Sequence, residues 1–390
     1  MTKKLAVIGS GTAGALTAAY FNRWEDWEID WYYDPNISSW PVGEGATLTL
    51  VRHINTSLGF THYDLPKVDG TFKSGVFKTG WGNGSEFFHA FQGTDVAYHF
   101  NAKALQKYIL DKLSLSPKIN VIEKNVSADD VDADYVFDCR GVPKNFDDYH
   151  ISDCVPVNSA YVTQCYWDHP KFQYSLMLAN KYRWVFGIPL RNRCSIGYLY
   201  NDSLNTLEEV KQDVQHIFSD YELTPSDTTL SLKFKNYYSK APFDGRIYKN
   251  GTAAFFLEPL EAASVGMISH NCITARNYWN GQEITVDDVN NWFIGRIKEI
   301  ENMIMIHYYA GSQFDTPFWK YAQGRARKNI QSTFLTNPRF SALFPYANKF
   351  THGDGHQGEY GTWGIPNWKV HFDQFNVWKD FPWQNIPMAN

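Results

Sequence analysis

The chain has 390 residues, more than one ordinary hydrophobic core supports, so a large fold of two parts is expected. Hydrophobic residues make up 44% and charged residues 20%, a composition typical of globular rather than disordered proteins. The formal net charge is −5 and no long run of Lys and Arg is present, which argues against nucleic acid as a partner. No apolar stretch reaches the roughly 18 residues of a membrane span, so no membrane association is expected.

The cysteine usage indicates a reducing environment. The five cysteines are odd in number and none forms a CxxC pair, which favours free thiols and excludes a structural zinc. The N-terminus lacks the long apolar segment of a signal peptide, so a cytoplasmic location is expected. No His, Cys and Asp residues have the spacing of metal ligands, so no metal site is expected, and no GxSxG nucleophile elbow occurs.

The first residues have the pattern of a nucleotide-binding βαβ unit. The apolar run 5–8 predicts a buried parallel strand, and residues 15–21 predict a helix. The glycines between them let the main chain approach a pyrophosphate at the helix N-terminus, and the acid after the second strand accepts from a ribose hydroxyl. The motif alone leaves FAD and NAD open. The expected cofactor-binding residues are Gly9, Gly11, Thr12, Ala13, Gly14 and Asp34.

Two later segments could carry chemistry. Residues 40–47 form a Gly-rich loop, which is a plausible strap across the cofactor and includes Gly43 and Glu44. Lys73 lies in a strand-like alternation and shares a face with Thr71 and Gly75. A solvated lysine on an edge strand is the commoner alternative; a buried one would be available for chemistry. Lys78 is expected to face oppositely and to serve as a control.

His89 and Phe91 are two residues apart and are expected on one strand face. They form either a packed core pair or a stacking platform for an indole or a phenol. Further along the chain, residues 133–141 predict another strand and residues 157–200 a strand-rich section, in which Trp184 and Phe186 share a face.

The segment around residues 258–264 predicts a helix that begins at Pro259. Its free N–H groups near Ala263 and Ser264 would form an anion site, suited to a halide or to the negative edge of a reduced flavin. Glu261 falls in this first turn, where simple helix capping is the alternative. The preceding residues 251–256 predict a strand that approaches the cofactor.

The last part of the chain predicts one long helix and then short elements. Thr285 and Asp288 form a capping box, and apolar residues keep helical spacing from there to about Tyr309. After Pro345 the chain is rich in Gly, Trp and Asn, which predicts loops and short elements packed by their rings.

Five segments occur in the same order as in the flavin-dependent tryptophan halogenases, and over most of residues 1–310 the chain resembles that family. They are residues 9–14, 42–44, 72–73, 184–189 and 258–264. The resemblance implies an α/β fold: a Rossmann-like, flavin monooxygenase-like FAD module over residues 1–280, with the strand-rich section 157–200 inserted. A smaller, mainly helical and aromatic-rich substrate module would follow over residues 281–390.

The resemblance also implies an activity. Such an enzyme uses FADH2 from a separate flavin reductase, O2 and a halide (chloride, bromide or iodide) to form hypohalous acid. The halogen is then placed on a small, electron-rich aromatic substrate of indole, phenol or aniline type. The first alternative is a flavin-dependent aromatic hydroxylase. The second is a flavoprotein of the same fold that binds a ligand in its pocket without catalysis. A homo-oligomer is compatible with the sequence.

Individual roles follow from the matched positions. Lys73 matches the lysine that receives hypohalous acid, and Glu261 matches the glutamate that polarises the electrophile and accepts the ring proton. His89 and Phe91 match substrate-stacking positions. The peptide groups of Ala263 and Ser264 match the halide site, and Gly43, Glu44, Thr252 and Val265 complete the expected cofactor-binding residues.

Three departures from the family pattern are present. Phe186 replaces the second tryptophan of the WxWxIP motif, Ala262 replaces the serine after the glutamate, and the strap 43–47 is one residue longer. The chain is also shorter than tryptophan-specific members. A more open pocket and broader acceptance of aromatic compounds and halides are therefore expected.

Overall fold

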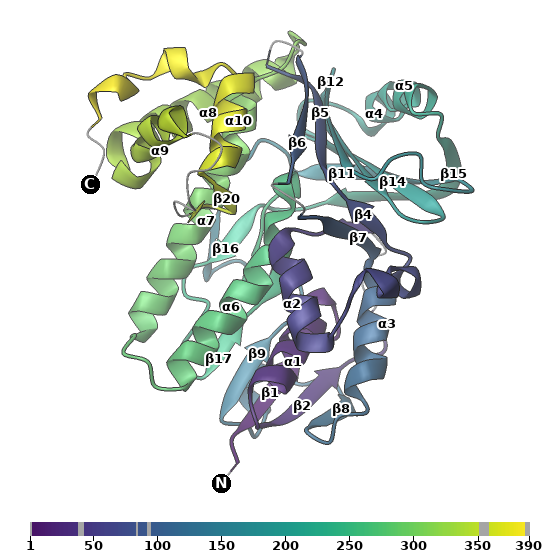
Figure 1. Ribbon diagram of the computed structural model, residues 1–390, viewed down its shortest axis with the longest axis vertical. Helices are drawn as coiled ribbons and strands as arrows, with labels where there is room; N and C mark the ends of the chain where they lie inside the picture. The colour runs from purple at the N-terminus through teal and green to yellow at the C-terminus, as the bar shows by residue number, and fades with distance from the viewer. Residues whose placement is uncertain (1, 38–42, 83–84, 92–94, 351–358, 387–390) are drawn as a thin grey trace.

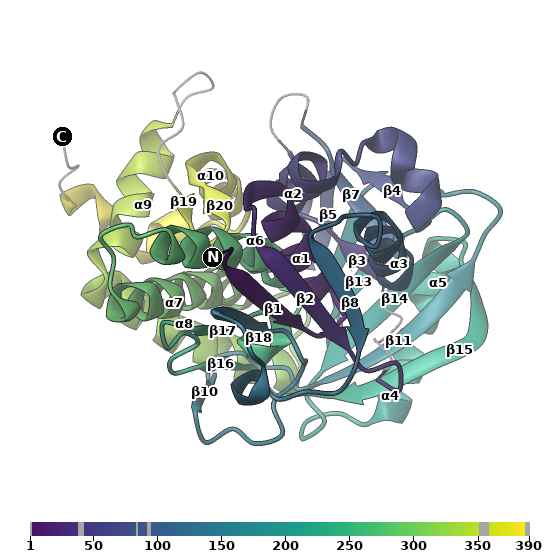
Figure 2. The ribbon, with the colours of Figure 1, turned by 90° about the horizontal axis from the view of Figure 1, so that it is seen from below.

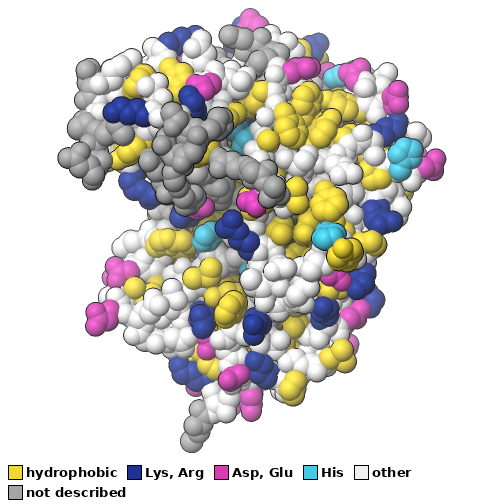
Figure 3. Space-filling view, viewed as in Figure 1, with side chains coloured by type: hydrophobic (Ala, Val, Ile, Leu, Met, Phe, Trp, Pro, Cys, Tyr) yellow, Lys and Arg dark blue, Asp and Glu magenta, His cyan; other side chains and the backbone are white. Residues whose placement is uncertain are grey.

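The computed structural model describes the whole chain except residues 1, 38–42, 83–84, 92–94, 351–358 and 387–390. Residues 40–42 of the expected strap therefore lie outside the described residues. Figure 1 shows the N-terminal elements at the bottom, a large twisted sheet at the upper right and the C-terminal helices at the upper left. Positive and negative side chains are interspersed over the face in Figure 3.

A five-stranded parallel sheet forms the nucleotide-binding part of the fold. Its order is β17-β9-β1-β2-β8. The sheet packs against α1 and α6, whose buried residues form one hydrophobic cluster with strand residues such as Leu5 and Ile29 (Figure 2). The bounds are β1 (Lys4–Ile8), β2 (Glu28–Tyr33), β8 (Ile119–Glu123), β9 (Tyr135–Asp138), β17 (Ile247–Lys249), α1 (Thr12–Trp24), α3 (Ala102–Leu113) and α6 (Ala263–Trp279).

A seven-stranded sheet forms the second layer, in the order β15-β11-β14-β13-β12-β5-β6. One face is covered by α4 (Leu207–Asp213) and α5 (Gln215–Asp220), and the opposite face by the C-terminal helices. Trp184 and Phe186 share a face, as predicted, and both pack in the hydrophobic cluster that contains the C-terminal helices. The strands are β5 (Gly75–Trp81), β6 (Ser85–Ala90), β11 (Ser159–Tyr166), β12 (Ser175–Asn180), β13 (Arg183–Pro189), β14 (Arg193–Tyr200) and β15 (Thr224–Lys233).

The C-terminal helices are α7 (Val286–Ala310), α8 (Pro317–Thr336), α9 (Pro338–Lys349) and α10 (Ile365–Gln374). The predicted capping box at Thr285 begins α7. The expectation of short elements packed by their rings after Pro345 is confirmed over residues 359–364 and 377–385, but α9 continues past Pro345 to Lys349 and α10 is a regular helix. Ring burial overrides the loop-like composition here: Phe344 and Phe372 stack with centroids 4.3 Å apart.

Short elements connect these layers. A small sheet of β3 (Gly43–Gly45), β7 (Ala97–Asn101) and β4 (Thr71–Lys73) lies between the two large ones, next to α2 (Leu48–Leu58). The others are η1 (His62–Val68), η2 (Ala128–Asp130), β10 (Tyr149–Ile151), β16 (Tyr237–Ser239), η3 (Gly251–Ala253), β18 (Phe255–Phe256), η4 (Leu260–Ala262), β19 (Glu359–Tyr360), β20 (Trp363–Gly364), η5 (Val377–Asp380) and η6 (Trp383–Asn385).

The predicted fold class is confirmed: the fold is α/β, with a Rossmann-like parallel sheet and a helical C-terminal part. A search of the described residues for a helix with the length and apolar character of a bilayer span finds none. All five cysteines are buried and free.

Candidate active site

The three glycines at the start of α1 have different surroundings. A Cβ on Gly9 would lie 2.4 Å from the carbonyl oxygen of Cys139, and one on Gly14 would lie 1.8 Å from the Gly9 oxygen. These two glycines are therefore required by the packing of the chain itself. A Cβ on Gly11 would meet nothing within 4 Å. Open space thus remains at the N-terminus of α1, which has no side-chain cap and no acidic residue in its first turn. This fits the approach of a pyrophosphate.

Asp34 follows β2, and hydrogen bonds hold its carboxylate in one orientation. It accepts hydrogen bonds from the main-chain N–H of Asn36 at 2.9 Å and from Nδ2 of Asn125 at 3.0 Å. The Asn36 bond is the main reason why the pKa of Asp34 lies below its ordinary value. The group is therefore an ionised acceptor at the end of the strand, as a ribose hydroxyl requires.

The segment with Thr252 packs on the first turn of α1, since a Cβ on Gly251 would lie 2.4 Å from that of Ala13. The expected strand 251–256 is only partly right. Residues 251–253 form the η3 turn and only β18 is extended. The reason is local: Asn250 accepts from the Gly251 N–H, and Gly251 has a φ of 61°.

Gly43 and Glu44 form β3 with Gly45, which pairs with β7. At the other end of this strap, the hydroxyl of Thr47 would lie 3.5 Å from a Cβ on Gly266, next to Val265 in the first turns of α6. Contacts of α1 with α2, α6 and η3 bring the expected cofactor-binding residues to one part of the molecule.

The turn before α6 is left-handed at two successive residues. Glu261 has a φ of 66° and Ala262 a φ of 53°. Such a conformation costs a non-glycine residue on the order of 1 kcal/mol or more. The helix therefore begins at Ala263 and not, as predicted, at Pro259. The Glu261 carboxylate makes no capping bond to α6, which removes the capping alternative.

The Glu261 carboxylate instead pairs with Lys78. The Lys78 side chain is fully buried, and its Nζ contacts Oε1 of Glu261, Nε2 of His307 at 2.8 Å and Nε2 of His371 at 2.6 Å. The prediction that Lys78 faces away from the site is wrong. Ser74 separates β4 from β5, which belong to different sheets, so the alternation does not continue from Lys73 to Lys78.

Glu261 is ionised in this environment. Burial alone would raise the pKa of its carboxyl, but the charge of Lys78 holds the pKa well below its ordinary value. Burial lowers the pKa of the Lys78 amine to about 8. At neutral pH the two groups form a buried ion pair.

Lys73 is buried too, with 5% of its surface exposed, so the solvated alternative is excluded. Its Nζ donates to the carbonyl oxygen of Ala46 in the strap at 3.2 Å and lies 5.8 Å from the centre of the Phe91 ring. Burial, opposed by the charge of Glu261 and reinforced by that of Lys78, lowers the pKa of Lys73 to about 8. Lys73, Lys78 and Glu261 therefore lie within electrostatic reach of one another.

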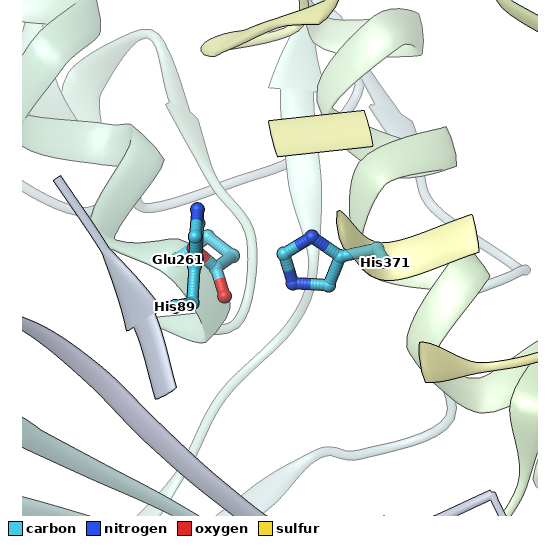
Figure 4. A group of neighbouring side chains, drawn as sticks. All are labelled: His89, Glu261 and His371. Carbon is cyan, nitrogen blue, oxygen red and sulfur yellow. The ribbon is translucent and has the colours of Figure 1, made fainter. Parts of the chain in front are cut away.

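His89 lies on the Glu261 side of the site. Its Nδ1 is 3.9 Å from Oε2 of Glu261, and its ring meets the rings of His371 and Trp363 edge to face at 4.7 and 5.7 Å. Both His89 ring nitrogens are buried, and neither has a hydrogen-bond partner among the described residues. Figure 4 shows His89, Glu261 and His371 pointing toward one another from β6, the turn before α6 and α10.

Comparison with known proteins identifies the family. Residues 4–111 and 90–354 match the model of the tryptophan halogenase family. This chain belongs to the tryptophan halogenase family. It is 24% identical to tryptophan 7-halogenase RebH of Lentzea aerocolonigenes over 263 residues, 58% of this chain and 48% of that protein. Tryptophan 6-halogenase ThaL of Streptomyces albogriseolus is 24% identical over 177 residues, 44% of this chain and 33% of that protein. The matches span half or less of these relatives.

Solved structures of halogenases have the same fold. BrvH, a flavin-dependent halogenase of Brevundimonas sp. BAL3, superposes with a TM-score of 0.77 at 17% identity, covering 99% of this chain and 94% of that chain. MibH, a tryptophan 5-halogenase, superposes with a TM-score of 0.79 at 17% identity, covering 96% of this chain and 86% of that chain. At this identity the likeness establishes the fold alone.

The family motifs at residues 184–189 and 258–264 meet in a network that the sequence did not reveal. The buried Glu258 carboxyl accepts from Nε1 of Trp184 at 2.8 Å and from the hydroxyl of Tyr308 at 2.9 Å. Burial raises the pKa of Glu258 to about 8, so the group is largely protonated at neutral pH. The sequence did contain an indication of this network, because Glu258 stands in the motif 258–264 and Tyr308 lies near the end of the long predicted helix. The ring of Phe186 lies over Gly197, and a Cβ on Gly197 would be only 2.0 Å from a carbon of that ring. Gly197 therefore leaves the space that the Phe186 ring occupies.

Trp363 is a second residue that the sequence did not assign. Its Nε1 donates to Oε2 of Glu261 at 3.3 Å, and its ring stacks on that of His371 at 3.9 Å. It lies in β20, one of the short elements expected after Pro345.

Among the described residues, one group of side chains has the geometry of a metal site. Ligand atoms of His89, Glu261 and His371 lie within 4.8 Å of one another. The Lys78 amine, however, contacts two of these residues directly, so positive charge already stands where a cation would bind. The expectation of no metal stays a prediction.

Proposed function

We propose that this member of the tryptophan halogenase family is an FADH2-dependent halogenase. It would use O2 and a halide to form hypohalous acid and place the halogen on an electron-rich aromatic ring. The observation that carries the proposal is the burial of the Lys73 amine and the ionised Glu261 carboxylate in one region, beside the strap and the start of α6.

FAD would be held by the open space at Gly11, the uncapped start of α1, Asp34, the strap at Gly43 and Glu44, and the segment with Thr252. When bound, the reduced flavin supplies the electrons that activate O2. The strap approaches Lys73 closely, since a Cβ on Gly45 would lie 3.4 Å from the Lys73 Nζ.

The halide would bind at the main-chain N–H groups of Ala263 and Ser264. These stand at the positive end of the dipole of α6, a helix of 17 residues without a side-chain cap. Glu261 as a whole is partly exposed although only 5% of its side chain is, so the exposure lies in its main chain. Peptide groups rather than carboxylate oxygens therefore face the open side of this turn.

Lys73 and Glu261 would act in sequence on the oxidised halogen. With its pKa lowered to about 8, Lys73 is neutral in a larger fraction of molecules than an exposed lysine. The neutral amine either donates a hydrogen bond to hypohalous acid or takes the halogen and releases water. The ionised Glu261 carboxylate then accepts the proton that leaves the substituted ring.

The aromatic substrate would stack against His89 and Phe91, on the side of the site that also contains Trp363. Indoles, phenols and anilines have rings of suitable size and electron density. We propose further that the FAD module ends near residue 280, that the chain after it forms the substrate module, and that a separate flavin reductase supplies FADH2. These assignments rest on the family, and a homo-oligomer is compatible with them.

A mass-spectrometric screen tests the proposal. Aromatic compounds are incubated with the protein, a flavin reductase, FAD, NADH and each halide in turn. We expect products whose mass shifts by the halogen present, and no product without halide. Addition of oxygen without halide would instead identify a hydroxylase, and no product from any compound would leave only a binding protein.

A further inference from the structure

The surroundings of Lys78 account for every proton on its amine. A protonated amine has three N–H groups, and three acceptors lie within hydrogen-bond distance: a carboxylate oxygen of Glu261 and the Nε2 atoms of His307 and His371. These acceptors come from the turn before α6, from α7 and from α10. Four separate parts of the chain thus meet at one buried nitrogen.

Both histidines are fixed in the form that accepts. Nδ1 of His307 lies 2.9 Å from the carbonyl oxygen of Met303, and Nδ1 of His371 lies 2.7 Å from that of Asn367. A carbonyl oxygen can only accept, so the proton of each ring is on Nδ1 and the lone pair is on Nε2. Burial holds the pKa of both rings below the ordinary value, to about 4 for His307, so both are neutral at neutral pH.

We propose that Lys78 is a positioning residue: its ammonium, held by His307 and His371, keeps Glu261 ionised and fixed in its left-handed turn. The inference rests on the proposed function and assigns the two buried lysines different tasks. Lys78 has no free lone pair while all three of its N–H groups are engaged. Lys73 has one hydrogen bond among the described residues, to Ala46, and remains the reactive amine.

The energetic role of Lys78 follows from the turn it holds. Two successive left-handed residues without glycine persist only where surrounding contacts favour them. The Glu261 side chain supplies such contacts through Lys78 on one oxygen and Trp363 on the other. Without the ammonium, the carboxylate would be a buried charge with two neutral rings beside it, and protonation would become favourable.

The titratable groups that face Glu261 come from every element packed around it. They are Lys73 from β4, Lys78 from β5, His89 from β6, His307 from α7 and His371 from α10. The three histidines are held neutral by burial, and Lys73 contacts the strap. Lys78 is therefore the charge whose loss should change the ionisation of Glu261 most.

The test is the pH profile of halogenation by the wild type, Lys78→Met and Lys78→Arg. Because Glu261 must be ionised to accept a proton, Lys78→Met should move the acid limb of kcat upward by about 1 pH unit or more. Its KM for the aromatic substrate should change less than kcat. Lys78→Arg, which keeps the charge, should return the acid limb toward the wild-type position. Equal loss of activity at every pH, or an unchanged profile in Lys78→Met, would overturn the inference.

A second measurement does not depend on whether the Lys78 variants fold. Histidine-ring 15N NMR of the wild type, assigned with His307→Asn and His371→Asn, should show both rings neutral at pH 7 with the proton on Nδ1. A proton on Nε2 of either ring would overturn the inference. The proposed function and the role of Lys78 can be refuted independently. A wild type that forms no organohalogen refutes the proposed function, whereas the NMR result still tests the hydrogen bonds around the Lys78 ammonium.

Discussion

Lys78 and Glu261 are 183 positions apart in the chain, yet their side chains form an ion pair that is almost completely buried. The pair joins the seven-stranded sheet to the turn that begins α6. Removing one partner of such a pair typically costs about 3–5 kcal/mol, because the other charge remains buried without compensation. The turn expected to present the halide site is thus linked directly to β5 of the seven-stranded sheet, the strand that follows β4 with the reactive Lys73.

Substitution of Glu261 by glutamine should reduce kcat by about 10²- to 10⁴-fold, because the amide cannot accept the ring proton. The measurement is steady-state product formation at saturating halide and flavin. Glu208→Gln, at an exposed carboxylate in α4, is the matched control and should keep the wild-type rate. A Glu261→Gln enzyme as fast as the wild type would leave the carboxylate only its structural pairing with Lys78.

Gly11→Val should prevent FAD uptake while leaving the fold intact, because a side chain there enters open space rather than the protein core. Cofactor fluorescence after reconstitution measures uptake, and circular dichroism measures the fold. Gly295→Val is the control, since its Cβ also meets nothing within 4 Å but stands at an exposed position of α7. Normal FAD binding by Gly11→Val would place the cofactor elsewhere.

Glu258 should make the stability of the protein depend on pH. Its pKa in the folded chain is about 8, above the ordinary value of 4.5, so the folded state holds a proton that the unfolded state releases. The free energy of unfolding should therefore fall as pH rises from about 4.5 to 8, by up to about 1.4 kcal/mol per unit.

Glu258→Gln should flatten that dependence, because the amide oxygen still accepts from Trp184 and Tyr308 without titrating. Urea unfolding at pH 5 and pH 8 compares the two proteins, and the variant should gain relative to the wild type at pH 8. Parallel curves across this pH range would mean that Glu258 is ionised in the folded state.

No metal should be needed for activity, since the Lys78 ammonium occupies the space among Glu261, His307 and His371. Dialysis against EDTA should change neither the rate of halogenation nor the midpoint of thermal unfolding. Elemental analysis of the purified protein should find no transition metal in stoichiometric amount. A bound metal whose removal abolishes activity would show that the ammonium site is described wrongly.

Sequence reasoning was most successful where the determining contacts are local. The strand before Gly9, the helix after it and the capping box at Thr285 depend on neighbours within a few residues, and the structure has all three. Loops and short elements were predicted after Pro345 because composition was considered without packing, whereas α9 extends past Pro345 and buried rings such as Phe372 form the helix α10 there.

The candidate site was predictable only in part, for a physical reason. Lys73 and Glu261 stand in recognisable motifs, but Lys78 contacts His307 and His371 across 229 and 293 positions. No periodicity spans such distances. The strand break at Ser74 further reversed the face expected for Lys78, so the buried ammonium could be found only from coordinates.

The most direct test of the proposed chemistry is where the oxidised halogen goes in the wild type and in Lys73→Ala. With bromide, FADH2 and O2 supplied, and a soluble amine present to trap free hypobromous acid, the wild type should brominate its substrate and lose little oxidant to the trap. Lys73→Ala should consume O2 at a similar rate and bind FAD normally, yet transfer the bromine to the trap. Bromination of the substrate by Lys73→Ala at the wild-type rate would show that the buried lysine does not hold the halogen.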